Sequence, residues 1–174
     1  NSSNCCFVLP QCNVVLFYLG RLPIEQQLRY FLEHYGLPEI MTEVDPNERS
    51  DVNSGKLYRQ LVEEGVINSR TITLQINADG ASCFKKSKFS FWPLVALIND
   101  VPYKLRRSYI IFLALWFGNK KPPAGVFLNS VIEDLNRLEG DGFEFNGVSY
   151  KIRVLIITTD TVTDTTDTPR RKSF

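Results

Sequence analysis

The sequence contains little histidine, cysteine or methionine. Its single histidine among 174 residues, His34, stands near the end of a helix-like segment, where histidine is more often structural than catalytic. The four cysteines do not make a dense disulfide framework, so we expect a reducing compartment. They are Cys5, Cys6, Cys12 and Cys83.

The first 20 residues offer half of a zinc-binding pattern. Cys5 and Cys12 resemble one side of a zinc ribbon, in which paired cysteine ligands lie close together in sequence. No second pair of Cys or His ligands follows at a suitable spacing. We therefore expect residues 1–20 to be an N-terminal remnant without a metal, in which the roles of the cysteines stay undefined.

Long hydrophobic runs are also absent. No apolar stretch approaches the roughly 18–20 residues that a membrane-spanning helix needs, and residues 13–20 lack the basic flank and cleavage site of a signal peptide. The composition, 44% hydrophobic and 22% charged, is that of a globular chain with one core and at most a small appendage. The first residue is Asn rather than Met, so we expect the chain to be a piece of a longer protein.

Charge is unevenly distributed although the net charge is only +1. Residues 81–121 carry eight Lys or Arg against a single acid, Asp100, whereas the segments on either side carry more acids than bases. A basic segment of this kind can bind phosphate backbones, and a solvated rim of loops is the alternative interpretation. The basic residues are Lys85, Lys86, Lys88, Lys104, Arg106, Arg107, Lys120 and Lys121.

Two helices are predicted in the first 70 residues. Residues 23–35 open with a proline, which suits a first helical turn, and repeat apolar side chains at helical spacing until Gly36. A polar, acidic connector follows. Residues 54–65 predict a second, short helix, with Ser54 as its cap and Gly65 at its end.

Three strands are predicted in the middle of the chain. Residues 71–79 alternate apolar and polar side chains, which is the period of a strand. Residues 90–100 form a second candidate, in which Pro93 indicates an edge strand or a bulge. Residues 108–118 are apolar on both sides, which predicts a central strand that is buried on both faces. The two tryptophans lie within these apolar strands, so we expect both in the core.

A helix and one more strand complete the pattern. Residues 126–140 have a single apolar stripe, Asn146-Gly147 is a strong hairpin signal, and residues 150–160 form a long apolar strand. With the short hairpin arm set aside, the order is strand, strand, strand, helix, strand. This order describes an α/β fold with an RNase H-like mixed sheet, in which the helix returns the chain so that the last strand lies beside the first.

Both of the strands expected to be neighbours end on an acid. Asp79 follows the first strand and Asp160 closes the last, so the two carboxylates are expected near one edge of the sheet. Such a pair repels unless a cation lies between its members, and Mg²⁺ or Mn²⁺ accept carboxylate oxygens and support phosphodiester chemistry. The alternative is that Asp79-Gly80 is an ordinary turn dipeptide and that Asp160 is one acid in a Thr-rich run.

Four short motifs follow one another across residues 71–160. A hydrophobic strand ends in Asp79-Gly80, and a serine-containing run then ends in Trp92-Pro93. An Asn-x-x-Pro-like segment and a Gly-x-Lys-x-Pro stretch come next, at Asn99 to Pro102 and at Gly118 to Pro122. In this order the motifs resemble the catalytic core of DNA transposases of the En/Spm (CACTA) type and their animal relatives. The upstream pieces PIEQQL and SGKLYRQL are similar to what precedes that core.

The resemblance implies an RNase H-like fold with an Asp-Asp-Glu transposase ancestry, a Mg²⁺ or Mn²⁺ cofactor and DNA as the partner. By position, Asp79 matches the first catalytic acid and Asp160 the second, and both would be metal ligands. The third acid is absent from this chain, because Asp164 and Asp167 lie too close to Asp160 to take its role. Whether these residues alone form an enzyme is therefore left open by the sequence.

The sequence supports three interpretations. The first is a fragment or degenerate copy of a cut-and-paste DNA transposase, which would be nuclear, would bind transposon ends and would have no membrane partner. The second is a nucleic-acid- or protein-binding module that kept the fold and lost the chemistry, and the third is a globular remnant without activity. A homo-oligomer is compatible with each of them.

The expected organisation has four parts. An N-terminal remnant at 1–20 precedes a helical segment at 21–68 and the RNase H-like core at 69–160. Residues 161–174 have the composition of a disordered tail, whose basic cluster after Pro169 resembles a nuclear-import or nucleic-acid patch.

Overall fold

The computed structural model describes residues 5–8, 15–35, 51–82 and 88–159. Its helices are α1 (Ile24–His34), α3 (Lys56–Glu63) and α4 (Ala124–Gly140), with short 3₁₀ turns η1 (Val52–Ser54) and η2 (Arg106–Ser108). Its strands are β1 (Cys5–Val8), β2 (Val15–Arg21), β3 (Thr71–Ala78), β4 (Ala81–Ser82), β5 (Ser90–Ile98), β6 (Ile110–Gly118), β7 (Phe143–Phe145) and β8 (Val148–Thr159).

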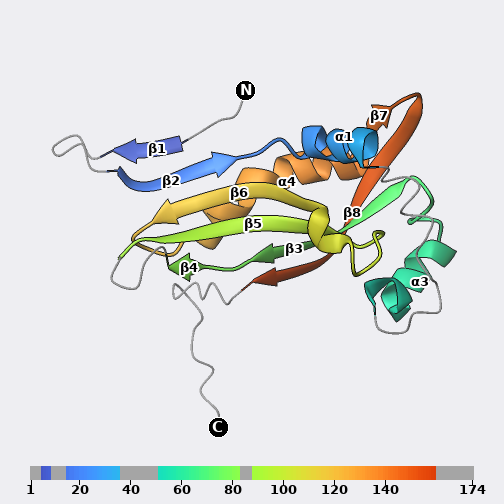
Figure 1. The fold of residues 1–174 in the computed structure, drawn as a ribbon, viewed down its shortest axis with the longest axis horizontal. Helices are drawn as coiled ribbons and strands as arrows, with labels where there is room; N and C mark the ends of the chain where they lie inside the picture. Colours follow the sequence, from blue (N-terminus) through green and yellow to red (C-terminus); the bar gives the residue numbers. More distant parts are fainter. Residues whose placement is uncertain (1–4, 9–14, 36–50, 83–87, 160–174) are drawn as a thin grey trace, which may run out of the picture.

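The strands form a mixed sheet in the order β1-β2-β6-β5-β3-β8-β7, with β4 paired to β5 (Figure 1). The β3–β8 pair is parallel, and the other pairs are antiparallel. A parallel neighbour requires a crossover, which α4 supplies between β6 and β8. The chain is therefore a mixed α/β protein, and the prediction that its first and last long strands lie side by side is confirmed.

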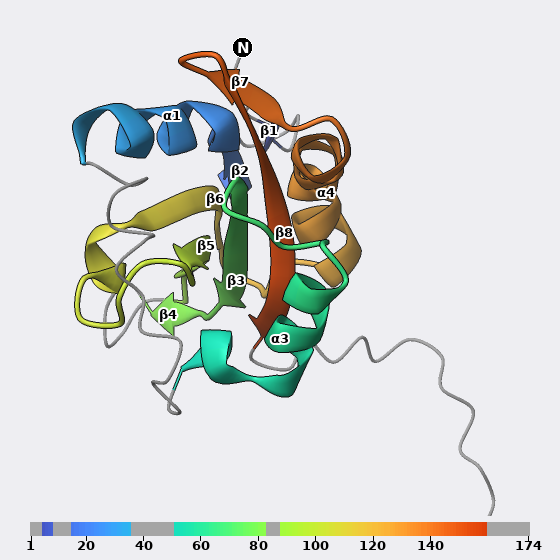
Figure 2. The same ribbon diagram turned by 90° about the vertical axis from the view of Figure 1, so that its right-hand side faces the viewer.

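One face of the sheet carries the core. Ile72, Leu74 and Ile76 of β3 share this face with Leu94 and Ile98 of β5, and residues 71–74 of β3 are all buried. Helix α4 lies behind the sheet in Figure 1, and Figure 2 shows α1 across the top of the molecule with α4 beside β8. The helices contribute Ile24, Leu28, Leu32, Phe127, Val131, Leu135 and Leu138 to the same apolar cluster. Burial of this face is the main source of stability.

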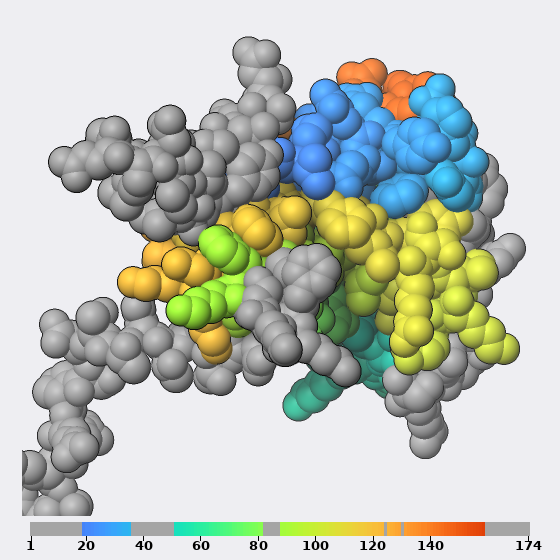
Figure 3. All heavy atoms as spheres, turned by 60° about the vertical axis from the view of Figure 1, so that its left-hand side comes forward, coloured from blue at the N-terminus to red at the C-terminus, as the bar shows by residue number. Residues whose placement is uncertain are grey.

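The opposite face of β5 and β6 is only partly covered. Phe112, Leu115 and Phe117 of β6 are 48%, 38% and 38% exposed, and Figure 3 shows the lime and yellow-to-orange segments reaching the surface between α1 and α3. Strand β6 is central, as predicted, but the prediction that it is buried on both faces is wrong. The run of apolar residues at 108–118 does not reveal that helix α4 covers only one face of this strand (Figure 1).

Both predicted helices of the first 70 residues are present, with one change. The second begins later than expected, because residues 52–54 form the separate turn η1 and Gly55 precedes α3. Ser54 is therefore not the cap; the Asp51 carboxylate accepts a hydrogen bond from the Val52 amide at the start of η1. Gly65 ends the segment with φ +72°, a conformation that favours glycine.

The hairpin and bulge signals are also informative. Asn146 and Gly147 both have positive φ, as the predicted turn between β7 and β8 requires. Strand β5 lies between β6 and β3, so the edge interpretation of Pro93 is wrong. The β5–β6 register does shift close to Pro93, between Leu94 and Val95, but the extra residue is Leu113 of β6 rather than a residue of β5.

Strands β1 and β2 are elements that the sequence did not predict. Residues 17–21 of β2 pair with β6, so this part of the expected N-terminal remnant belongs to the sheet. The exposed edge of β6 beyond β2 is covered by Gln27 of α1, whose side-chain amide exchanges two hydrogen bonds with the backbone of Phe112, at 2.7 and 2.9 Å. Cys5 lies in β1, and Cys12 lies outside the described residues, as does the tail expected at 161–174. No helix in the described ranges is long and apolar enough to cross a membrane.

A buried polar network fastens the segment before α3 to the loop after β5. Arg106 donates to both carboxylate oxygens of Asp51, at 2.8 and 2.7 Å, and also to the carbonyl oxygens of Asn99 and Val101. Burial would raise the pKa of the Asp51 carboxyl, but the hydrogen bonds and charge of Arg106 lower it overall. The pair is thus a buried ion pair that closes one end of the sheet.

A second buried acid lies in the same network. The Asp100 carboxylate accepts hydrogen bonds from the backbone amide and hydroxyl of Thr73, at 2.5 and 2.9 Å, and from the Tyr58 hydroxyl at 3.1 Å. Burial raises the pKa of the Asp100 carboxyl despite these bonds. The Asn99-to-Pro102 motif therefore has a structural role in this fold.

Replacing Asp51 by Ala should lower the free energy of unfolding by about 3 kcal/mol, because the Arg106 guanidinium would stay buried without its carboxylate. The Asp51 contribution should be present above its unfolded pKa and be lost as pH falls through the lower folded pKa. Urea unfolding followed by tryptophan fluorescence at pH 7 and at pH 3 measures both effects.

The matched control for this experiment is Arg107→Ala, which removes an exposed neighbouring cation and should change the unfolding free energy by less than about 0.5 kcal/mol. Equal losses in the two variants would contradict the role given to the Asp51–Arg106 pair.

Candidate functional site

Asp79 lies at the carboxyl end of β3, where the parallel pair with β8 also ends. The last paired residues are Ala78 and Thr159, and Asp79 and Asp160 are the next residues of each strand in the sequence. The Asp79 side chain is exposed, and no ion pair joins it to another described residue. Asp160 itself lies outside the described residues.

The peptide after Asp79 packs against a tryptophan. A Cβ atom added at Gly80 would come within 2.5 Å of the Trp92 indole ring, so only glycine fits this approach without a shift. Strand β5 pairs with β3 up to Ala78 and with β4 from Ala81, which leaves Asp79 and Gly80 alongside Trp92 and Pro93. Because proline has no amide donor, the ladder is interrupted beside Asp79.

The loop after β6 completes the surroundings of Trp92. The Lys121 ammonium lies 5.2 Å from the centre of the Trp92 ring, a cation–π distance, and the Trp116 indole donates to the Lys120 carbonyl oxygen at 3.1 Å. Both tryptophans are buried, as predicted. The sequence did not predict that Trp92 also supports the turn that carries Asp79. The sequence signal for this contact was that a Trp-Pro dipeptide, Trp92-Pro93, occurs in the strand that follows Asp79-Gly80.

The basic residues of the 81–121 segment lie at two ends of the sheet. Lys88 precedes β5, and Lys120 and Lys121 follow β6, which places all three at the end where Asp79 lies. Lys104 and Arg107 are exposed on the loop between β5 and β6, at the opposite end. The nine residues of β5 separate the two groups by about 27 Å. The described part of the segment is therefore not one continuous surface.

The rest of that set is one buried arginine and two lysines outside the described residues. Arg106 is 6% exposed and bonded to Asp51, so the structure does not present its guanidinium to a ligand. Lys85 and Lys86 lie outside the described residues. The sequence could not distinguish Arg106 from Arg107, because only the fold turns one of two adjacent arginines inward.

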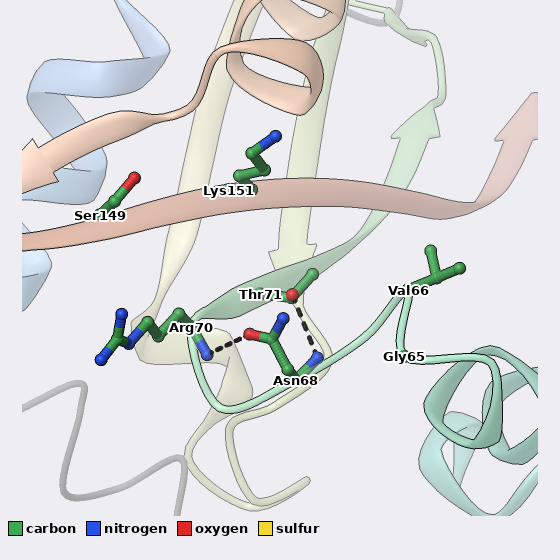
Figure 4. Close-up of a pocket in the computed structure, with 7 residues that line it drawn as sticks. All are labelled: Gly65, Val66, Asn68, Arg70, Thr71, Ser149 and Lys151. Atoms are coloured by element: carbon green, nitrogen blue, oxygen red, sulfur yellow. Dashed lines mark hydrogen bonds between the residues drawn. The ribbon is translucent and has the colours of Figure 1, made fainter.

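A pocket of about 340 Å³ lies at the opposite end of β3 from Asp79 (Figure 4). It is lined by Gly65, Val66, Asn68, Arg70, Thr71, Ser149 and Lys151. Asn68 bonds within the same turn: its side-chain oxygen accepts a hydrogen bond from the Arg70 backbone amide, and its backbone amide donates to the Thr71 hydroxyl. The Arg70 and Lys151 side chains point in different directions in Figure 4, and the Lys151 ammonium donates to the Gly140 carbonyl oxygen at 2.5 Å. The pocket thus lacks converging charged groups.

No cluster of three or more His, Cys, Asp or Glu side chains that could hold a metal occurs among the residues described by the structure. The pair predicted from the sequence has one member, Asp79, in this part of the chain. Carboxylate oxygens are the donors that Mg²⁺ and Mn²⁺ prefer, and an exposed carboxylate at a strand end, without an ion pair to any described residue, is compatible with such a ligand.

No protein-family model matches the chain, and no curated protein matches it. The residues and their geometry therefore carry the proposals below.

Replacing Gly80 by Ala should destabilise the protein by about 1–3 kcal/mol, because the new methyl group would overlap the Trp92 ring. The emission of Trp92 should change as well, since the ring must move. Thermal unfolding and tryptophan fluorescence measure these two effects.

Gly125→Ala is the matched control, because a Cβ at that helical position meets nothing within 4 Å. It should leave stability unchanged or raise it by up to about 1 kcal/mol. A Gly80→Ala variant with unchanged stability and emission would contradict the packing described for Asp79-Gly80.

Proposed function

We propose that this chain contains the RNase H-like core of a DNA transposase, as a fragment or degenerate copy, with Asp79 and Asp160 as ligands for Mg²⁺ or Mn²⁺. The observation that carries the proposal is the parallel β3–β8 pair, whose two strands end level with each other at Ala78 and Thr159. Each strand is followed in the sequence by an aspartate.

The strand order supports the proposed fold. Strands β6, β5, β3 and β8 are neighbours in that order in the sheet. In the chain, β3, β5 and β6 come first, and helix α4 then leads from β6 toward β8, which is parallel to β3. An RNase H-like sheet has three antiparallel strands and a fourth that returns beside the first, which is the arrangement expected from the motifs shared with En/Spm-type transposases.

An irregularity in β8 supports the proposed pairing of the acids. The register moves from Leu74–Val154 to Gln75–Ile156, so Leu155 is an extra residue in β8. Successive side chains of a strand alternate between faces, so one extra residue changes the face of every residue after it. With Leu155 included, Thr159 pairs with Ala78, the residue before Asp79.

The proposed metal would supply Lewis-acid stabilisation of a phosphodiester, and this chain would supply two of its carboxylate ligands. Asp79 is exposed and without an ion pair among the described residues, so its oxygens are available. Gly80 and Trp92 fix the backbone that carries it. A transposase of this type needs a third acid, so we propose an ancestral activity rather than complete catalysis by these residues.

The alternative function is a nuclear nucleic-acid-binding module that does not need metal. It is favoured by the three lysines that lie at the Asp79 end of the sheet, Lys88, Lys120 and Lys121. In either case DNA is the proposed partner, since a basic surface beside a carboxylate site suits a phosphate backbone.

Titration calorimetry with Mn²⁺ should detect weak binding to the chain, and the double variant Asp79→Ala, Asp160→Ala should abolish it, because both ligands at the strand ends are removed. The matched control is Asp141→Ala, Glu144→Ala, which removes two exposed carboxylates beyond the far end of α4 and should keep the affinity. Binding that survives in the strand-end variant would contradict the metal site.

DNA binding should depend on the lysines at the Asp79 end. Lys120→Glu, Lys121→Glu should weaken binding to a duplex by about tenfold or more and reduce its salt dependence, because phosphate contacts are lost. Fluorescence anisotropy at several salt concentrations measures this, with and without Mn²⁺.

Lys104→Glu, Arg107→Glu changes the same net charge at the opposite end of the sheet and is the control for DNA binding. If both double variants lose affinity equally, the effect is one of net charge and the placement of DNA beside Asp79 is wrong. Binding that ignores Mn²⁺ would favour the binding module over the transposase fragment.

A further inference from the structure

Strand β8 has one side without a complete partner. It pairs with β3 over residues 151–159 on one side, and β7 pairs only with residues 148–150. Over residues 151–159 no other described strand pairs with this outer edge. An unpaired edge presents backbone donors and acceptors to any chain that can form a strand beside it.

The first part of this edge is shielded by charged side chains. Ile152 and Val154 point to the core face, so Lys151 and Arg153 start from the opposite face. Both nevertheless bond to the end of α4 on the core face: Lys151 to the Gly140 carbonyl oxygen and Arg153 to the Glu139 carboxylate. Since β3 lies on the inner side, these side chains must pass the outer edge. Lysine and arginine on an edge strand prevent pairing with other chains.

The second part, residues 154–159, has no charged side chain to shield it, and the bulge at Leu155 is the one interruption of its edge. Its sequence, VLIITT, contains no charged residue, proline or glycine. Ile157 is 58% exposed. The Lys151 amide donates toward β3, to the Arg70 carbonyl oxygen. In a parallel ladder, the backbone N–H and C=O groups of successive residues point alternately toward the two neighbouring strands. With the extra residue at Leu155 taken into account, the backbone groups of Val154 and Ile157 point away from β3, to the outer edge.

We propose that residues 154–159 of β8 pair with the same segment of a second copy of this chain, antiparallel about a two-fold axis. An edge strand is its own complement in this geometry, because each outward residue both donates and accepts, and a two-fold contact closes on itself. The lack of charge in 154–159 allows two identical segments to meet without repulsion. Lys151 and Arg153 would oppose a longer overlap.

Helix α4 adds apolar surface at the same end of the molecule. It starts where β8 ends, because α4 runs from the end of β6 back along the sheet and β8 then returns. Val126 in its first turn and Ile132 at its middle are 53% and 41% exposed. A second copy pairing through β8 would bring its own α4 to this side, so the contact would bury more than the two strands. The proposal is independent of the transposase function.

Sedimentation velocity on the whole chain should show a dimer at about 100 µM that dissociates on dilution, as for a small interface. Ile157→Lys should weaken the dimer by about tenfold or more, because a charge on an edge strand opposes pairing. Leu57→Lys is the matched control: Leu57 of α3 is equally exposed, at 58%, and lies outside the proposed contact, so this variant should still dimerise.

The outcomes distinguish the proposal from its alternatives. A monomer at 100 µM would overturn it and leave the edge to a different partner. If the Ile157→Lys variant dimerised with unchanged affinity, the proposal would also be overturned. Loss of the dimer in the Leu57→Lys variant would overturn it too, because the contact would then lie on α3.

Hydrogen exchange on the unmodified protein gives a test that does not depend on the folding of a variant. On dilution, the outward amides of Val154 and Ile157 should exchange faster, while that of Arg153, which faces β3, should not change. Equal exchange of the outward amides at high and low concentration would exclude strand pairing as the dimer contact.

Discussion

The parallel pairing of β3 with β8 is the constraint on which the rest of the structure depends. A parallel neighbour cannot be reached by a hairpin, so the chain needs α4 as a crossover, and α4 then covers one face of the sheet. That face becomes the core, in which Ile72, Leu74 and Ile76 pack with the helices. The same pairing sets the ends of β3 and β8 level with each other.

The two ends of the sheet differ in what they can do. At the amino end of β3, the buried carboxylates of Asp51 and Asp100 are fully bonded, to Arg106, Thr73 and Tyr58, and cannot take part in binding without breaking the fold. At the carboxyl end the acid is exposed and its backbone is held by apolar packing instead. The Trp92 ring holds the backbone at Gly80 in place while the Asp79 carboxylate stays exposed, an arrangement suited to binding a ligand from solution.

Local patterns were sufficient to predict elements that depend on local forces. The alternation of 71–79, the stripe of 126–140 and the Asn146-Gly147 turn each gave the correct element, because strand period, helix period and positive φ are properties of a few adjacent residues. Strand β2 was missed, since it pairs with β6 over a long sequence separation, and β1, which pairs with β2, was missed with it. The same limit applies to Arg106 and to the support of Asp79 by Trp92, which only the tertiary fold creates.

The extra residue in β8 has a consequence for comparing sequences. It lets the strand gain one residue without moving its end along the sheet. The number of residues from the Asn146-Gly147 turn to the end of β8 is therefore not fixed by the length of the strand alone. A relative without the bulge would reach the same level one residue sooner, with the ends of the two strands still aligned. A one-residue gap in an alignment of this strand would therefore mark the presence or absence of the bulge, and would not by itself mean that the end of β8 has moved along β3.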